Sequence, residues 1–230
     1  MQSVIELIDF TKSYGGKIAV DGVSMSVKQG EITALLGENG AGKTTILKAL
    51  CGLHKATNGS VRITGEVGYV PEIPILYDDF TVKEMLFFAG EIRDIQGKKL
   101  EEAFDRVIND CKLESVLNKR ISTLSKGFTQ RVSFAAALIH DPEVLILDEM
   151  ASGLDPAQIK QMRALVKRLS QTKTVLISTH LMQEVDALAE KIFILKQGKI
   201  IAQGSAESIM KQAKCSTLED AFIKLNQDKR

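Results

Sequence analysis

The chain contains no tryptophan, three cysteines and four prolines among its 230 residues, and aromatic residues make up only 5% of it. Its cysteines, Cys51, Cys111 and Cys215, are far apart and odd in number, and none belongs to a Cys-x-x-Cys pair. The sequence therefore indicates neither a disulfide framework nor a zinc site. Hydrophobic residues make up 44% of the chain. This is enough for one compact domain, or one core with an inserted subdomain, to fold without cross-links.

An excess of charge of either sign is also missing, because 30 basic and 29 acidic residues give a formal net charge of +1. Nucleic-acid binding depends on clustered Lys and Arg, so we expect no nucleic-acid partner. The N-terminus has no basic and apolar leader, and no apolar run approaches the roughly 20 residues that a membrane helix needs. We expect any role at a membrane to be exercised from its surface, through a partner.

A glycine-rich loop is the most informative feature that is present. It follows the apolar run 32–36 and leads into a helical pattern at residues 45–50. Glycines let successive N–H groups converge on an anion, and the following helix adds the positive end of its dipole. A tight turn without a ligand is the alternative, which the strand and helix context disfavours. The nucleotide-binding residues that we predict here are Gly37, Glu38, Asn39, Gly40, Ala41, Gly42, Lys43, Thr44 and Thr45.

Within this loop, two side chains have distinct predicted roles. We expect Lys43 to reach the β and γ phosphates of ATP, and the Thr44 hydroxyl to bind Mg²⁺. ATP and Mg²⁺ are the two cofactors that the sequence predicts.

The periodicity of the rest of the chain predicts an α/β fold. Predicted strands cover residues 4–10, 23–27, 60–64, 67–70, 144–147, 175–178 and 192–195, and helical patterns cover 157–169 and 181–189. Fully apolar strands that alternate with amphipathic helices imply a mostly parallel sheet covered on both faces. The first strands predict an N-terminal antiparallel β layer, and a helical period from Thr81 to about His140 predicts an inserted α-helical subdomain.

Together these patterns predict a P-loop NTPase (RecA-like) core within a single ATPase domain. Residues 1–80 and 141–205 form the expected nucleotide-binding core with its β layer. Residues 81–140 form the helical subdomain, and residues 206–230 a C-terminal helical tail.

An acidic pair, Asp148 and Glu149, ends the apolar strand 144–147. A carboxylate at this end of a parallel strand emerges at the edge where α/β proteins bind ligands. We expect Asp148 to hold Mg²⁺ through its water shell and Glu149 to polarise the water that attacks the γ-phosphorus. Acidic pairs are also common at helix starts, but the glycine loop upstream favours the functional interpretation.

Residues 124–131 precede another helical pattern, at residues 132–139. By itself Ser125 there indicates an ordinary helix N-cap. The combination of motifs resembles the ATP-binding subunit of ABC transporters over nearly the whole chain. In chain order, the matching segments are 37–45 (Walker A), 124–131 (the family signature), 144–149 (Walker B), 152–155 (the D-loop) and 178–180 (ending in the switch histidine).

The resemblance implies a head-to-tail dimer. In it, Ser125 and the Gly127 backbone of one subunit close on the γ-phosphate held by Lys43 of the other, and Asp155 couples the two sites. A second helix N-terminus would neutralise and desolvate that phosphate.

For catalysis, the resemblance implies that Glu149 is the general base and that His180 bridges the γ-phosphate and the attacking water. Tyr14 stands where the family has an aromatic residue that stacks on adenine. His54 and His140 are expected to be surface or loop residues.

Some positions depart from the common family pattern. Glu72 stands where many members have a glutamine that senses Mg²⁺ and contacts the membrane partner. Its carboxylate can accept but not donate a hydrogen bond, so we expect Glu72 to contact Mg²⁺ or its water with Thr44 and Asp148. Lys126 and Phe128 replace a Gly and a Gln of the commonest signature, and Met150 replaces a Pro after Walker B. The Lys126-Gly127 pair of the signature, Glu72 and the ending at residues 217–222 together resemble exporter-type subunits related to the drug, sodium and haem-exporter ATPases of bacteria.

The expected partners are a second ATPase subunit, identical or paralogous, and separate integral membrane permease subunits. The chain would then be cytoplasmic and peripheral on the inner face of the cell membrane, held there through the permease. Candidate residues that receive a permease helix lie between Glu72 and Phe88, and most of the apolar ones are expected to be core: Phe80, Leu86, Phe87 and Phe88. The transported substrate is not encoded here, because its contacts belong to the permease.

Two rival functions remain. One is a soluble ABC-type ATPase that acts as a mechanical switch on ribosomes or DNA. Such translation factors usually carry two cassettes, and the chromosome and repair types carry long coiled coils, neither of which is present. The other rival is a small-molecule kinase, which would lack the signature and the D-loop.

Overall fold

The structure, a computed structural model, describes residues 2–227. Met1 and residues 228–230, the end of the predicted C-terminal tail, lie outside the described residues. The strands are β1 Ser3–Tyr14, β2 Lys17–Lys28, β3 Ile32–Leu36, β4 Asn58–Ile63, β5 Val67–Val70, β6 Val144–Asp148, β7 Thr174–Thr179, β8 Lys191–Lys196 and β9 Lys199–Gly204. The α-helices are α1 Lys43–Leu50, α2 Val82–Glu91, α3 Lys98–Cys111, α4 Lys126–Leu138, α5 Pro156–Leu169, α6 Met182–Leu188, α7 Ala206–Ala213 and α8 Leu218–Gln227, with short 3₁₀ turns at Glu114–Val116 and Ile121–Thr123.

The larger sheet has the strand order β5-β6-β7-β3-β8-β9. Its first five strands are parallel, as the apolar runs predict, and β9 pairs antiparallel with β8. Every residue of β3, β6 and β7 is buried, because other elements cover both faces of the sheet. In register, Leu36 pairs with Thr179 and Asp148 with Ser178, so the carboxyl ends of these strands meet at one edge.

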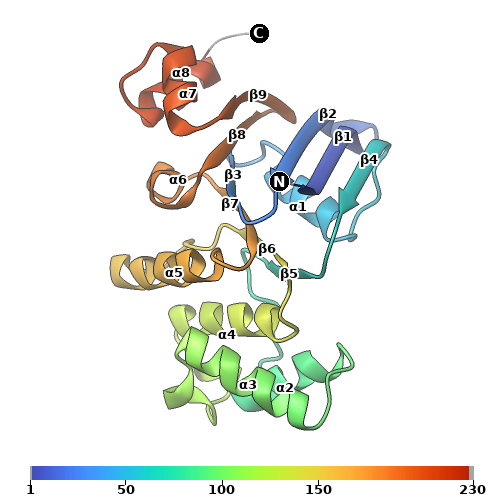
Figure 1. Cartoon of the computed structure of the whole chain (residues 1–230), viewed down its shortest axis with the longest axis vertical. Coiled ribbons are helices and arrows are strands. Elements are labelled where there is room, and N and C mark those ends of the chain that lie inside the picture. Colours follow the sequence, from blue (N-terminus) through green and yellow to red (C-terminus); the bar gives the residue numbers. More distant parts are fainter. Residues whose placement is uncertain (1, 228–230) are drawn as a thin grey trace.

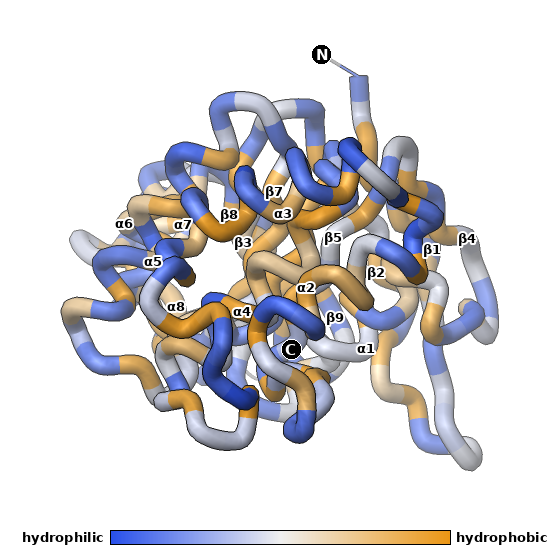
Figure 2. Tube along the Cα trace, turned by 90° about the horizontal axis from the view of Figure 1, so that it is seen from below, coloured by the Kyte–Doolittle hydropathy of each residue, from blue (hydrophilic) through white to orange (hydrophobic). Residues whose placement is uncertain are grey.

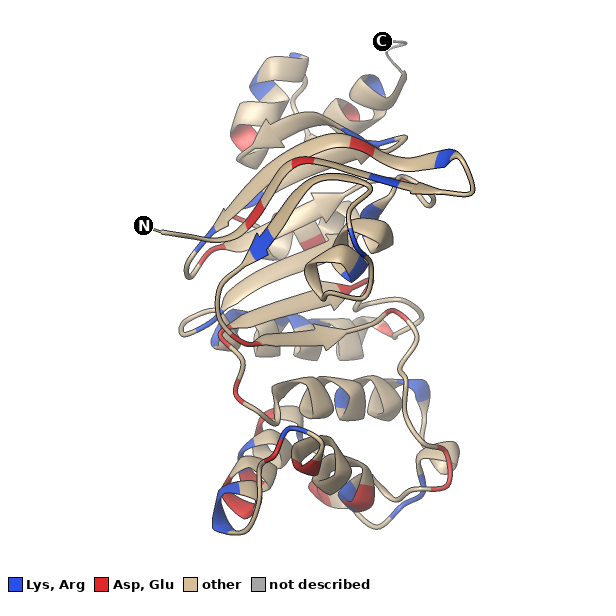
Figure 3. Ribbon diagram, turned by 90° about the vertical axis from the view of Figure 1, so that its right-hand side faces the viewer, with Lys and Arg blue, Asp and Glu red and all other residues tan. Residues whose placement is uncertain are grey.

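The second sheet is antiparallel, with the order β2-β1-β4. It lies across the larger sheet in Figure 3, where its strands carry both basic and acidic residues. Between the sheets, Ile46 and Leu47 of α1 pack in one hydrophobic cluster with Phe10 of β1 and Phe193 of β8. This cluster fixes the first helix against one face of the larger sheet, and so fixes the glycine loop that precedes the helix.

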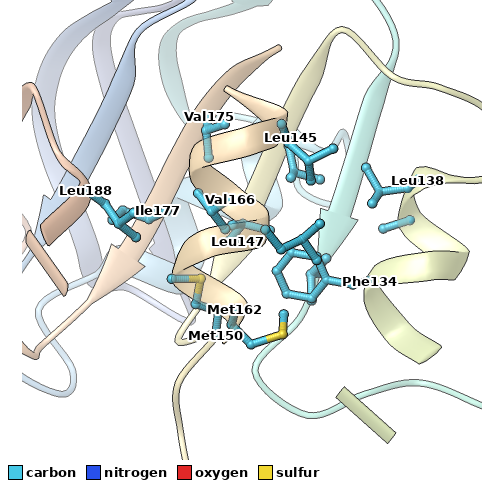
Figure 4. Close-up of a cluster of buried hydrophobic side chains, with 14 of the residues drawn as sticks. Phe134, Leu138, Leu145, Leu147, Met150, Met162, Val166, Val175, Ile177 and Leu188 are labelled. Atoms are coloured by element: carbon cyan, nitrogen blue, oxygen red, sulfur yellow. The ribbon is translucent and has the colours of Figure 1, made fainter. Parts of the chain in front are cut away.

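The helices α2, α3 and α4 gather at one end of the molecule (Figure 1). Phe134 and Leu138 of α4 point toward Leu145 and Leu147 at β6, and Met162 of α5 lies beside them (Figure 4). All five belong to the second large hydrophobic cluster, so the helical end shares its core with the parallel sheet. Figure 2 shows that hydrophobic residues gather in the strands at the centre of the molecule, whereas the loops at the outside are mostly hydrophilic.

Two features differ from the sequence analysis. Strand β9 has no counterpart there, because its hairpin turn uses Gln197 and Gly198, with φ of 47° and 81°, in place of the common Asn-Gly pair. Helix α4 starts at Lys126, six residues before the predicted helical pattern. Of the apolar residues considered for a permease contact, Leu86 is fully buried, which agrees with the expectation that most of them belong to the core. Among the described residues, no helix is both long and apolar enough to cross a membrane.

Candidate active site

The glycine loop turns from β3 into α1 through a backbone that only glycine adopts easily. Gly42 has φ of 108°, and a Cβ there would lie 2.8 Å from the carbonyl oxygen of Ala19. As the N-cap of α1, Gly42 offers no side-chain cap, so no side chain takes up the first N–H groups of the helix. The loop borders a cleft of about 340 Å³. The cleft is lined by Ala19, Asn39, Gly40, Gly42, Lys43, Thr44, Thr45, Glu72 and Glu149.

Lys43 is the cation of this cleft, and it is only 6% exposed. Its Nζ donates hydrogen bonds to the carbonyl oxygens of Gly37, at 2.7 Å, and Glu38, at 3.2 Å. The same Nζ lies 3.1 Å from Oε1 of Glu149. A buried ammonium requires such partners, and here they come from the loop and from the end of β6.

Glu149 joins the lysine to the switch histidine. Its Oε2 lies 2.8 Å from Nδ1 of His180, whose side chain is 44% exposed. The Glu149 backbone has φ of 48°, which costs a non-glycine residue about 1–2 kcal/mol, and its N–H donates to the Ser178 carbonyl at 2.9 Å. Strain of this kind is typical of functional positions that the surrounding fold holds in place.

Asp148 is 1% exposed, and its Oδ1 has no hydrogen-bond partner. Its Oδ2 lies 3.5 Å from the Tyr69 hydroxyl. Burial raises the pKa of Asp148 above its ordinary value, although the hydroxyls of Ser178 and Thr44 act in the opposite direction. A buried carboxylate oxygen without a partner, beside a threonine hydroxyl, is a hard-oxygen pair that suits Mg²⁺. The residues present therefore fit the ion that the sequence predicts.

The residues predicted to act on a neighbour's ATP do not line the cleft. Ser125 is exposed and holds the N-cap position of α4, but its side chain makes no cap hydrogen bond. Gly127 lies in the first turn of that helix, and its residue is buried. Asp155 is exposed and caps α5. The ordinary-cap interpretation of Ser125 is therefore not supported by its side-chain contacts.

Tyr14 is also absent from the cleft lining, as are Gly37, Glu38 and Ala41 among the predicted residues of the glycine loop. Tyr14 ends β1, is 44% exposed, and meets His54 edge to face with ring centroids 5.6 Å apart. His140 is partly buried, with Nε2 3.2 Å from the Val67 carbonyl. The sequence analysis missed Ala19, which lines the cleft from β2. No pattern in the sequence marks that residue, because the pairing of distant segments brings it there.

The family model described as ABC transporter matches residues 20–152, more than half of the chain. The chain belongs to the ABC transporter family. It is 37% identical over 217 residues to the bacitracin transport ATP-binding protein BcrA of Bacillus licheniformis, covering 88% of this chain and 70% of that protein. It is 35% identical over 229 residues to the Nod factor export ATP-binding protein I of Sinorhizobium fredii, covering 94% and 67% of the two chains.

Solved structures agree with this assignment. A bacterial ABC transporter cassette determined as a dimer matches with a TM-score of 0.80 and 26% sequence identity, covering 87% of this chain and 98% of that one. The α/β cassette fold and the ATP-binding role predicted from the motifs are thereby confirmed. This ABC transporter chain is an ATP-binding subunit, and the family's members are ATPases that power transport.

Proposed function

We propose that two copies of this subunit, or this subunit and a paralogue, close head to tail around two ATP molecules and hydrolyse them to drive a separate exporter permease. One observation carries the proposal: Lys43 and Glu149, which line the cleft beside the glycine loop, form a continuous chain of contacts with His180. These are a phosphate-binding cation, a base and a group that orients the base.

Each member of this chain of contacts has a separate task. Lys43 holds the β and γ phosphates as its ammonium turns from Glu149 toward them. Glu149 then has an oxygen available to accept the proton of the attacking water, and His180 holds the other oxygen in place. Mg²⁺, held through Thr44 and Asp148 with Glu72 at the cleft wall, would neutralise charge on the phosphates. Tyr14 supplies an exposed ring for the adenine.

The dimer is supported by what one chain leaves incomplete. The cleft is lined by residues of a single chain, and Ser125 presents a hydroxyl without a cap hydrogen bond at the start of a 13-residue helix. A second copy can bring that hydroxyl, the Gly127 backbone and Asp155 against the γ-phosphate. The dimeric cassette among the structural relatives supports the same arrangement.

A permease contact is supported by a groove of about 650 Å³ between the parallel sheet and the helical end. Ile75, at its rim, is 83% exposed, and neighbouring Ile73 is 77% exposed. By contrast Phe80 and Phe88 pack on each other and on Tyr77, and Phe87 packs on Phe104. We propose that Ile73 and Ile75, rather than these phenylalanines, meet an apolar helix of the permease.

We propose export because of the names of two relatives, and placement at the cytoplasmic face of the membrane because of the proposed permease contact. One is named for the export of Nod factor and one for the transport of bacitracin. The rival function is a mechanical switch that has no permease. Purification of the tagged chain from its own cells distinguishes the two, because a transporter subunit brings a multi-span membrane protein with it and a switch does not.

The proposed dimer is tested by Glu149→Gln, which keeps the shape of the base but cannot accept the proton of water. With ATP and Mg²⁺, this variant should change from monomer to dimer in light scattering, and it should not hydrolyse ATP. Glu143→Gln is the matched control, because Glu143 precedes the first residue of β6 as Glu149 follows the last, and this variant should retain ATP turnover. A Glu149→Gln chain that remains monomeric at high concentration, with and without its permease, would contradict head-to-tail closure.

A further inference from the structure

In the proposed dimer, two separate segments of one copy meet the ATP that is bound by the other copy. One is the start of α4 at Ser125, and the other is the D-loop, which ends at Asp155 where α5 begins. They are 30 residues apart in sequence, and α4 and α5 are neighbouring helices in Figure 1. One side chain, Gln158, contacts both segments.

Gln158 holds Asp155 through a capping box. The Asp155 N–H donates to Oε1 of Gln158 at 3.3 Å, and the Gln158 N–H donates to Oδ1 of Asp155 at 2.9 Å. This reciprocal pair sets the direction in which α5 starts, and so the position of the D-loop carboxylate. Helix α2 uses the same device with a glutamate, Glu84, paired with Thr81.

The same Gln158 carboxamide fills the space over Gly127. A Cβ at position 127 would lie 2.5 Å from Nε2 and 2.9 Å from Oε1 of Gln158. Such a Cβ meets the end of a flexible side chain and not backbone, so Gly127→Ala would displace the glutamine rather than unfold the helix. The glycine of the signature therefore decides whether Gln158 can stay on Asp155.

A second contact joins the same two segments through a side chain of α4 instead of α5. The Lys126 side chain, from the first residue of α4, lies against Gly153 of the D-loop, with Cε 2.9 Å from where a Cβ would stand. Further along α5, Gln161 touches Arg131 of α4, and Arg168 pairs with Asp110 of α3 at 2.8 Å. These later contacts hold the helices together but do not reach Asp155.

We propose that Gln158 is a positioning residue that couples the signature segment to the D-loop within one subunit, so that the exposed Ser125 and Asp155 keep a fixed position relative to each other and to the neighbouring ATP. This inference rests on the proposed head-to-tail dimer. It adds a residue that touches neither ATP nor the neighbour but sets the geometry of the residues that do. Displacing its carboxamide from either side should release both segments.

The first experiment uses hydrogen–deuterium exchange on the monomer without nucleotide, and it does not depend on dimer formation. Gln158→Ala removes one reciprocal cap, so the Asp155 amide should exchange about fivefold faster. Gly127→Ala, on the other helix, should accelerate the same amide by a similar factor, and the double variant should exceed neither single variant. Gln158→Glu should keep the protection, as Glu84 does in α2. Gln161→Ala is the matched control and should leave the Asp155 amide unchanged.

The second experiment measures the ATP concentration that gives half-maximal dimer in a Glu149→Gln background. Gln158→Ala should raise that concentration about fivefold, Gln158→Glu should restore it, and Gln161→Ala should not alter it.

The two experiments separate the possible failures. If the Glu149→Gln parent never dimerises, the proposed function fails, and the exchange data alone decide the coupling. If Gly127→Ala leaves the Asp155 amide protected, or if Gln158→Ala dimerises like Gln161→Ala, the coupling is refuted.

Discussion

The contact between Lys43 and Glu149 predicts an effect of Glu149→Gln on ADP binding. Lys43 is buried and has three partners: the Gly37 and Glu38 carbonyls and Oε1 of Glu149 at 3.1 Å. Phosphates must draw the ammonium away from the carboxylate, and the negative charge of Glu149 also opposes them. The amide of glutamine removes that charge while keeping the shape of the side chain.

The magnitude follows from the strength of charged hydrogen bonds. A hydrogen bond between charged groups contributes about 1.5–3 kcal/mol, and Lys43 keeps its two carbonyl partners when the carboxylate is lost. We therefore expect Glu149→Gln to lower the free energy of unfolding by about 1–3 kcal/mol. In the parent protein, ADP must displace Glu149 from Lys43, at a cost of roughly half of that interaction energy. The variant lacks this cost, so its dissociation constant for ADP should be about tenfold lower.

Isothermal titration with ADP at low protein concentration measures this effect without dimer closure, since ADP has no γ-phosphate for Ser125 to meet. Urea denaturation gives the loss of stability. Glu143→Gln, which keeps an oxygen to accept the Glu66 N–H, should not change the affinity for ADP. The Glu149→Gln substitution must therefore lower the stability of the protein while it raises the affinity for ADP. An unchanged or weaker affinity for ADP in the stable, folded Glu149→Gln chain would show that the carboxylate does not compete for Lys43.

Three further predictions follow from other regions. Ile75→Glu changes a side chain that is 83% exposed, so it should change the free energy of unfolding by less than about 0.5 kcal/mol but prevent co-purification with the permease. Ile18→Glu, in β2 of the antiparallel sheet, is the control and should not prevent co-purification. Phe134→Ala empties a fully buried site between α4 and β6 and should cost about 3–5 kcal/mol in urea denaturation. The hydrogen bond from Lys173 lowers the pKa of Asp141, so this carboxylate stabilises the fold above the unfolded-chain pKa of about 3.9, and the contribution is lost as the pH falls through the lowered value. Asp141→Asn should therefore cost under about 1 kcal/mol at pH 7, and the difference from the parent should shrink below pH 4.

The parts of this molecule that sequence could predict are those that depend on neighbours in the chain. The glycine loop is recognisable because a strand, glycines, a lysine and a helix follow one another directly. The parallel sheet is recognisable because its strands are apolar on both faces. The acidic pair is recognisable because it directly follows the apolar run 144–147 and so marks the carboxyl end of that strand.

The parts that sequence could not predict depend on contacts between distant segments. Strand β4 was predicted as a strand, but only its pairing with β1 places it in the antiparallel sheet. Exposure of Ile73 and Ile75 follows from the path of the loop between β5 and α2, whereas apolar character alone suggested the phenylalanines. Gln158 has no motif of its own, because its importance arises from packing on Gly127, 31 positions away.

These contacts also bear on the direction of the ATP cycle. The ammonium of Lys43 is already satisfied by its own chain, so ATP must exchange one set of contacts for another instead of meeting an unpaired charge. Once the γ-phosphate has left, Glu149 can again compete for that ammonium, and the affinity for the product falls. An exported substrate requires the dimer to reopen after hydrolysis, and the competition between a base and a phosphate for one lysine favours reopening from within each subunit. A variant that binds ADP more tightly should therefore also release it more slowly, which links the equilibrium measurement above to turnover.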